Sequence, residues 1–341
     1  GASSVDVQGA VTTTNLTTET AATIDSANIA GDLSVSGGTL TVDTANAVVG
    51  GNADINSQVS VTSGSLAVTG TSAIGANVTT STSQTYTGAA TLDAGGALNL
   101  TGSTVSFGNS LTGDNENLTI TGNGSFTGAV SSIAALQVTG DATTGSTVSA
   151  TSVAFDSNSS LGGNVTATGD ITLSDSDGVV LTADTELDGD NVTVSSGVSG
   201  AFTLTLDGAS SVDVQGAVTT TNLTTETAAT VDSINIGGNL SVAGGTLTVD
   251  NGDATVGGNT DIDSNVSVTG GSFSVTGTSD IGANVTTSAN QTYSDAITLT
   301  ANSVLMAGGN IDVQEIDGAF DVTLDATGCL LYTSPSPRDT A

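Results

Sequence analysis

Positively charged side chains are almost absent from this sequence. Its 341 residues contain no histidine and one lysine or arginine, Arg338, against 34 aspartates and glutamates, which gives a formal net charge of −33. Nucleic-acid binding requires cations that replace the counterions of the phosphates, and binding to an anionic membrane surface requires them too. General acid–base and phosphoryl-transfer catalysis rely largely on histidine, lysine and arginine. We therefore expect neither a nucleic-acid-binding protein nor an enzyme.

Other absences narrow the fold class. No apolar run approaches the 18 residues that a membrane-spanning helix needs, so we expect no membrane insertion. The 45 glycines and the many β-branched residues disfavour long helices. Disorder is disfavoured because 36% of the residues are hydrophobic and only two are proline. An all-β chain with a thin core remains.

The sequence repeats itself at an offset of 207 residues. Gly1–Thr23 recurs unchanged at Gly208–Thr230. The similarity continues without insertion or deletion to Gly88 in the first copy and to Asp295 in the second. Nested repeats of this kind indicate a solenoid or an array, in which each unit buries its apolar face against its neighbours.

A second internal similarity links Val179–Asp207 to Ile297–Asp325. From the two similarities we predict a first long repeat unit over 1–207 and a second, incomplete copy over 208–328. Both would belong to one β-solenoid.

Residues 329–341 differ in character from the rest of the chain. They hold the only cysteine, Cys329, together with both prolines and Arg338. This segment resembles translated sequencing-adapter read-through of the kind found in assembled environmental sequences. We interpret it as a non-native tail; a genuine short tail is the alternative. Because the chain starts at Gly1 without a signal-peptide pattern, we expect a fragment of a larger chain that continues at both ends.

The local hydrophobic pattern has a period of two. Apolar residues alternate with serine, threonine, aspartate or asparagine, as in Leu33/Val35, Leu40/Val42 and Val59/Val61. This pattern predicts strands of roughly three to five residues with one buried face. Small inward residues fit a narrow parallel β-solenoid, with turns of roughly 20–26 residues and roughly 13–16 rungs. An array of β-sandwich repeats is the alternative, and Asn-Gly pairs leave antiparallel hairpins open.

Several motifs resemble filamentous-haemagglutinin-type repeats. They are Gln84–Leu92, its copy Gln291–Leu299, and the run from Gly128 to Gly140. Such repeats occur in very large bacterial exoproteins and autotransporter-like adhesins. The resemblance covers nearly all of 1–328 and implies a right-handed parallel β-helix that is secreted through the outer membrane. It also implies an extracellular, outer-membrane-associated stalk or adhesin, with a host or cell-surface glycan or protein as its partner.

The densest acidic cluster offers candidate metal ligands. Its members follow one another at every second residue: Asp184, Glu186, Asp188 and Asp190. The spacing is similar to the start of a helix–loop–helix calcium loop, but the twelfth position is Ser195 instead of glutamate. On a strand Asp184, Glu186 and Asp188 would share one face, and Leu187 would point to the other. A Ca²⁺ site and a solvated acidic face are therefore the two interpretations, and we expect no other cofactor.

Three other functions are left open by the sequence. Paired carboxylates such as Asp261/Asp263 or Asp175/Asp177 would suit a β-helical polysaccharide-active enzyme, although no catalytic residue is assigned. Paired threonines such as Thr203/Thr205 would suit a solenoid that interacts with ice or calcium. A phage fibre segment is the third alternative.

Overall fold

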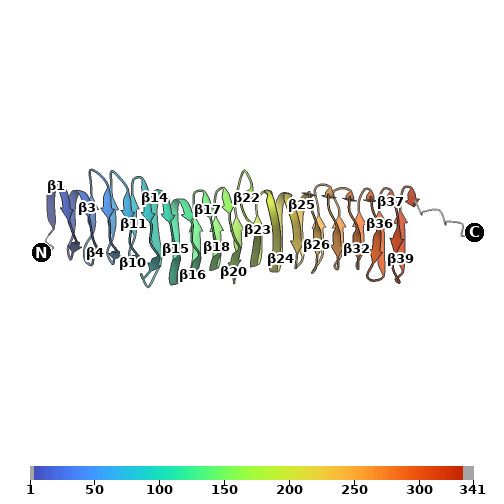
Figure 1. The fold of residues 1–341 in the computed structure, drawn as a ribbon, viewed down its shortest axis with the longest axis horizontal. Helices are drawn as coiled ribbons and strands as arrows, with labels where there is room; N and C mark the ends of the chain where they lie inside the picture. The colour runs from blue at the N-terminus through green and yellow to red at the C-terminus, as the bar shows by residue number, and fades with distance from the viewer. Residues whose placement is uncertain (1–3, 333–341) are drawn as a thin grey trace, which may run out of the picture. The chain divides into compact units, whose positions relative to one another are not determined.

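The computed structural model describes residues 4–332, and every regular element in that range is a β-strand. The chain divides into two compact units, Gly1–Asp175 and Ser176–Ala341. Within each unit the strands of successive turns lie side by side (Figure 1), and all their pairings are parallel. The fold is thus a parallel β-solenoid, as the sequence predicted. The parallel pairing makes the sandwich and hairpin alternatives wrong.

The strands are short and numerous. The first unit holds β1 (Val5–Thr13), β2 (Leu16–Thr18), β3 (Ala22–Ile29), β4 (Leu33–Val35), β5 (Leu40–Val42), β6 (Ala47–Val49), β7 (Ala53–Ile55), β8 (Val59–Val61), β9 (Leu66–Val68), β10 (Ser72–Ile74), β11 (Val78–Thr80), β12 (Ser83–Tyr86), β13 (Ala90–Leu92), β14 (Leu98–Phe107), β15 (Leu111–Phe126), β16 (Val130–Val138), β17 (Ala142–Thr144), β18 (Val148–Phe155), β19 (Ser159–Leu161), β20 (Val165–Ala167) and β21 (Ile171–Leu173). The second holds β22 (Val179–Leu181), β23 (Thr185–Val194), β24 (Val198–Thr225), β25 (Ala229–Ile236), β26 (Leu240–Val242), β27 (Leu247–Val249), β28 (Ala254–Val256), β29 (Thr260–Ile262), β30 (Val266–Val268), β31 (Phe273–Val275), β32 (Ser279–Ile281), β33 (Val285–Thr287), β34 (Gln291–Tyr293), β35 (Ile297–Leu299), β36 (Ser303–Ala307), β37 (Ile311–Val313), β38 (Ile316–Asp317), β39 (Val322–Ala326) and β40 (Leu330–Tyr332).

Three strands make one turn of the solenoid. β4, β5 and β6 follow one another around the turn, and β7 then pairs with β4. In the same way β8 pairs with β5 and β9 pairs with β6. We call the loop between two strands of one turn a corner. These turns therefore have three short faces separated by three corners, whereas longer strands such as β14, which pairs with both β11 and β12, run through a corner.

The period-two pattern of the sequence decides which side chains enter the core. In β5 the first and third residues, Leu40 and Val42, are buried, while Thr41 between them points outward. The next two turns place Val59 and then Val78 at the position of Leu40. Equivalent side chains therefore stack in columns, and burial of these apolar columns is the main favourable term of the fold.

The turns are shorter than the sequence suggested. Register partners lie from 16 residues apart, as for Val11 and Ala27, to 22 apart, as for Val78 and Leu100. The chain makes about 17 turns, slightly more than the predicted 13–16. Corners of a few residues suffice to join the faces, so each turn needs fewer residues than we expected.

Asparagine and aspartate side chains join successive turns at one corner. Asn15 Oδ1 accepts a hydrogen bond from the backbone N–H of Asp32 (2.8 Å), and Asp32 Oδ1 accepts one from Asn52 N–H (2.7 Å). Asn52 Oδ1 continues the series by accepting from Thr71 N–H (2.9 Å). The glycine before each receiving residue leaves room for the arriving side chain, because a Cβ on Gly51 would lie 2.4 Å from Asp32 Oδ1. We call this series the corner ladder.

The second copy builds the same corner ladder. Asn222 Oδ1 accepts from Asn239 N–H (2.8 Å), Asn239 Oδ1 from Asn259 N–H (2.9 Å), and Asn259 Oδ1 from Thr278 N–H (3.0 Å). Asp32 in the first copy and Asn239 in the second each accept a hydrogen bond from a backbone N–H of the next turn. The ladder therefore needs an acceptor oxygen at this position, whichever of the two side chains supplies it.

The motif that carried the family resemblance has a structural role inside the core. The Gln84 side chain is fully buried, and its Nε2 donates to the carbonyls of Val78 (3.0 Å) and Thr101 (2.8 Å). Tyr86 Oη donates to Gln84 Oε1 (2.9 Å). Gln291 and Tyr293 repeat the arrangement in the second copy. These bonds satisfy a polar pair that would otherwise be costly to bury.

The C-terminal segment is described only in part. Cys329 is exposed, and its N–H donates to Asn310 Oδ1 (2.8 Å). Leu330–Tyr332 then form β40, which pairs with β37. The remaining residues of the predicted tail, including Arg338, lie outside the described residues. The division of the chain at 207 and 328 and the non-native origin of 329–341 stay predictions.

The corner ladder can be tested at Asn52. Replacing Asn52 with alanine removes the acceptor used by the N–H and the hydroxyl of Thr71, so we expect the free energy of unfolding to fall by about 1 kcal/mol. Asn52→Asp keeps the acceptor but adds a carboxylate one turn from Asp32, so it should keep most of the stability in high salt, where the repulsion is screened. Chemical denaturation measures both variants. Asn28→Ala, at an exposed outward position of β3, is the matched control, and an equal loss there would contradict the ladder.

Candidate functional site

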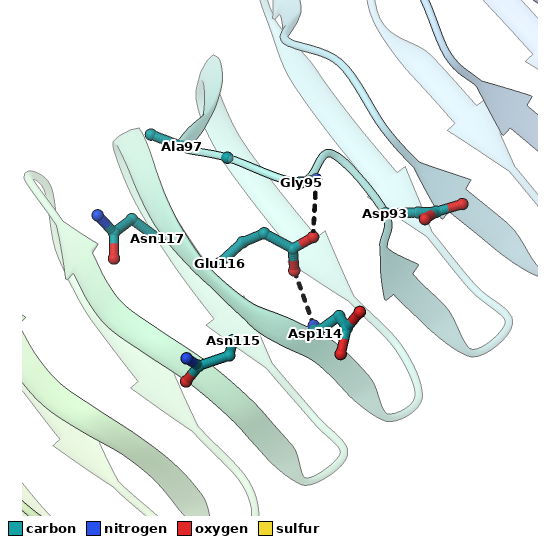
Figure 2. Close-up of a pocket in the computed structure, with 8 residues that line it drawn as sticks. Asp93, Gly95, Ala97, Asp114, Asn115, Glu116 and Asn117 are labelled. Carbon is teal, nitrogen blue, oxygen red and sulfur yellow. Dashed lines mark hydrogen bonds between the residues drawn. The ribbon is translucent and has the colours of Figure 1, made fainter.

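A hollow in the first unit interrupts the regular turn (Figure 2). It has a volume of about 340 Å³ and lies where the loop after β13 meets the middle of β15. Its lining is acidic and polar: Asp93, Gly95, Gly96, Ala97, Asp114, Asn115, Glu116 and Asn117. The turn that contains the loop after β13 is the longest of the described turns. Its register partners Val78 and Leu100 are 22 residues apart. The added residues bulge outward and form the hollow.

Glu116 holds the hollow together. Its side chain is only 6% exposed. Oε1 accepts hydrogen bonds from the N–H groups of Ala94 (3.1 Å) and Gly95 (3.1 Å), and Oε2 accepts one from Asp114 N–H (2.7 Å). Charge-assisted bonds of this kind compensate the desolvation of a buried carboxylate. Glu116 therefore ties the loop of one turn to the strand of the next.

Two left-handed backbone positions flank Glu116. Gly95 has φ +61° and Asn115 has φ 66°. Glycine adopts this conformation readily, and asparagine tolerates it better than most residues do. The N–H of Gly95 donates one of the hydrogen bonds that Glu116 Oε1 accepts. Asn115 directly precedes Glu116 in the chain. The local sequence therefore permits the two bends that surround the carboxylate.

The charged groups of the hollow are all carboxylates, and the amides of Asn115 and Asn117 add hydrogen-bond donors. Asp93 and Asp114 line it beside Glu116, whose two oxygens are already used by backbone N–H groups. Hydrolysis of a glycosidic bond would need two carboxyl groups placed on either side of the bond, and Asp93 and Asp114 are the pair available. Within residues 4–332 no group of three or more His, Cys, Asp or Glu residues is arranged to hold a metal ion.

This hollow was not among the sites predicted from the sequence. Two signals pointed to it: the glycine pair Gly95-Gly96, and the acidic and amide run from Asp114 to Asn117 at an interruption of the alternating pattern. Neither signal has a match in the second copy, where the similarity to the first ends at Asp295.

The predicted metal ligands lie along the outside of β23. Glu186, Asp188 and Asp190 alternate with the buried Thr185, Leu187 and Gly189, as expected for one face of a strand, and the exposed Asp184 comes directly before. Their hydrogen bonds run to the next turn. Asp184 Oδ1 accepts from Thr203 N–H (2.8 Å) and Asp190 Oδ1 from Ser210 Oγ (2.5 Å). These two carboxylates therefore bond between turns, and a Ca²⁺ site at the four residues stays a prediction.

Like charges crowd this acidic face. Burial raises the pKa of Glu186, and the carboxylates of Asp188, Glu226 and Asp207 add to the rise. Asp188 and Asp207 are register partners in adjacent turns.

Like charges also lie close together at the pair Asp261/Asp263. Asp261 points outward from β29, in register with Asp280 of the next turn. Burial raises the pKa of Asp261, with further contributions from Asp263 and Asp280. No described basic group offsets the repulsion, since the sole cation of the chain is Arg338.

Asp175, from the other predicted acidic pair, is the most unusual carboxylate of the first unit. It is 3% exposed, and burial raises its pKa to about 6. Ser159 offsets part of this rise and Asp141 adds to it, but neither carboxylate oxygen completes a hydrogen bond within the described residues. Its neighbour Asp177 is exposed. The two members of the pair therefore differ sharply in environment.

A pH titration tests the burial of Asp175. Because its pKa is raised in the folded state, the native protein binds more protons than the unfolded chain between about pH 4 and pH 6, so this residue makes stability fall as pH rises through that interval. Asp175→Asn should raise the free energy of unfolding at pH 7 by about 1–2 kcal/mol and flatten this part of the profile. Asp177→Asn is the matched control, and identical profiles for the two variants would refute the assignment.

The role of Glu116 is tested by Glu116→Gln. The amide keeps one acceptor but turns an NH₂ group toward a backbone N–H, so we expect a loss of about 1–3 kcal/mol in unfolding free energy. Asp93→Asn, in the same hollow, should change stability much less. Denaturant unfolding of both variants is the measurement. Similar losses would show that Glu116 has no special part in holding the loop.

Comparison with protein-family models, with curated proteins and with solved structures finds no match to this chain. The filamentous-haemagglutinin character is therefore a resemblance in motifs, and the β-solenoid of stacked turns is compatible with it. Among residues 4–332 there is no helix that is both long and apolar enough to cross a membrane.

Proposed function

We propose that this chain is a structural stalk or adhesin segment of a secreted bacterial cell-surface repeat protein. It has no enzymatic activity and needs no cofactor. The observation that carries the proposal is the equivalence of the two copies. Ala22 pairs with Leu40 in the first copy, and Ala229 pairs with Leu247 in the second. This equivalence suits a spacer, because a duplicated set of turns can pair with the existing turns in the same register. The solenoid then becomes longer without a change in its fold.

The exterior supports the same proposal. Outward positions carry short hydroxyl side chains in register, such as Thr85, Ser106 and Ser125, which stack in consecutive turns. With carboxylates and no described cation, this surface suits contact with solvent and with neutral or cationic groups on a host or cell-surface glycan or protein. Secretion to the bacterial surface follows from the resemblance of the repeats.

Deletion of one whole turn tests the spacer role. Removing Leu40–Gln58 takes out β5, β6 and β7 and brings Val59 to the position of Leu40, its register partner. We expect the shortened chain to fold, with a circular dichroism spectrum of the same shape and a melting temperature within a few degrees. Displayed between an outer-membrane anchor and an epitope, it should still present the epitope. A chain that fails to fold after this deletion would contradict the proposal.

The enzyme alternative is tested on the full chain. We expect no reducing ends above background when the protein is incubated with a panel of polysaccharides. Hydrolysis that Asp114→Asn abolishes, while Asp177→Asn leaves it intact, would overturn the non-enzymatic assignment and place catalysis in the hollow.

A further inference from the structure

Three buried oxygen atoms near the start of β19 accept no hydrogen bond from residues 4–332. Two are the carboxylate oxygens of Asp175, which is 3% exposed, and the third is Asn158 Oδ1. Buried polar atoms are nearly always paired, and a buried charge is costly unless a partner compensates it. The three oxygens therefore indicate a partner that comes from outside the chain.

The two residues approach each other from successive turns. Phe155, three residues before Asn158, pairs with Leu173, two residues before Asp175. Asn158 directly precedes Ser159, the first residue of β19. Burial raises the pKa of Asp175 and Ser159 partly lowers it again, so the Asp175 carboxylate lies near Ser159 although it completes no hydrogen bond there. The buried acceptors therefore gather at one corner of the first unit.

Asp141 brings a second carboxylate to this corner from the preceding turn. It directly precedes β17, whose first residue, Ala142, is the register partner of Ser159. Ser157 Oγ donates to Asp141 Oδ1 (2.8 Å), which fixes the carboxylate against the next turn. Asp141 also adds to the raised pKa of Asp175, as a nearby negative charge does. Residues 4–332 contain no lysine, arginine or histidine that could offset these charges.

The bonding pattern of the corner ladder reaches this corner and stops there. Asn123 Oδ1 accepts from Asp141 N–H (3.0 Å), and Gly140 leaves room for it, because a Cβ there would lie 2.4 Å from Asn123 Oδ1. The residue before Asn158 is Ser157 instead of glycine, and Asp141 Oδ1 accepts from the Ser157 hydroxyl. Asn158 Oδ1 then accepts from no N–H group. Oxygens that join turns elsewhere are therefore left for a ligand here.

We propose that this corner binds a Ca²⁺ ion through the carboxylates of Asp175 and Asp141 and the side-chain oxygen of Asn158. Ca²⁺ is bound by carboxylate, amide and backbone carbonyl oxygens, and water completes its shell. The set has two acidic members, so it differs from the groups of three or more that residues 4–332 lack. The ion compensates the buried charge of Asp175, and the fold does not require it. The site is separate from the acidic face of β23 and does not depend on the proposed stalk role.

Calcium titration of the full chain tests the proposal. Equilibrium dialysis in high sodium chloride screens weak binding to the acidic surface. We expect a single saturable site with a Kd on the order of 10⁻⁴–10⁻³ M, the range of extracellular calcium modules. Asp175→Asn and Asn158→Ala should each weaken binding at least tenfold. Asp177→Asn is the matched control, because Asp177 is exposed and lies two residues from Asp175, and it should bind calcium as the wild type does.

Thermal unfolding provides a second readout. An ion that binds the native site raises the melting temperature, so calcium should stabilise the wild type and leave Asp175→Asn at the melting temperature that equimolar Mg²⁺ gives. Mg²⁺ is smaller and gives up its water reluctantly, so it should bind this corner at least tenfold more weakly. The proposal is overturned if calcium shows no saturable binding, if Asp175→Asn binds it as the wild type does, if Asp177→Asn loses as much affinity, or if Mg²⁺ stabilises the wild type equally.

Discussion

Each turn of this protein must place its inward side chains directly over those of the turn before it. Parallel backbone pairing imposes this condition, because a shift of one residue would turn every inward side chain outward. Leu40, Val59 and Val78 satisfy it in consecutive turns. The corner ladder from Asn15 to Thr71 holds the same alignment from outside the core. Strand length, the glycine positions and the small size of the core residues all follow from this one alignment.

The same alignment creates the main electrostatic difficulty of the molecule. Neighbouring turns are about 4.8 Å apart, less than the Debye length of about 8 Å at physiological salt. A carboxylate at an outward position therefore meets its counterpart in the next turn, as Asp188 meets Asp207 and Asp261 meets Asp280. The raised pKa values of Glu186 and Asp261 record burial together with this repulsion. Serine and threonine between the carboxylates dilute the charge, which explains why hydroxyl side chains dominate the outward columns.

The sequence allowed the parallel solenoid to be predicted because its signal is local and repeated. A pair such as Leu33/Val35 indicates both that the segment is a strand and which of its side chains point inward. The 207-residue offset indicates that repeat units stack on one another. Turn length was overestimated because the number of residues in a corner depends on contacts between turns, such as the fit of Asp32 against Gly51. Of the expected shared face of Asp184, Glu186 and Asp188, the part on the strand was confirmed for the same local reason: Glu186 and Asp188 lie opposite the buried Leu187, whereas Asp184 precedes β23.

The hollow around Glu116 could not be predicted, because its residues meet only across turns. Ala94 and Gly95 lie 22 and 21 residues before the carboxylate that accepts their N–H groups, and nothing in the alternating pattern marks that distance. Asp175 poses the same difficulty, since its burial beside Ser159 depends on the preceding turn. In a solenoid, strands are encoded by neighbours in the chain, but sites are encoded by residues one turn apart. A sequence of this kind therefore reveals its fold much more readily than its sites, and departures from the regular turn are where specific chemistry should be sought.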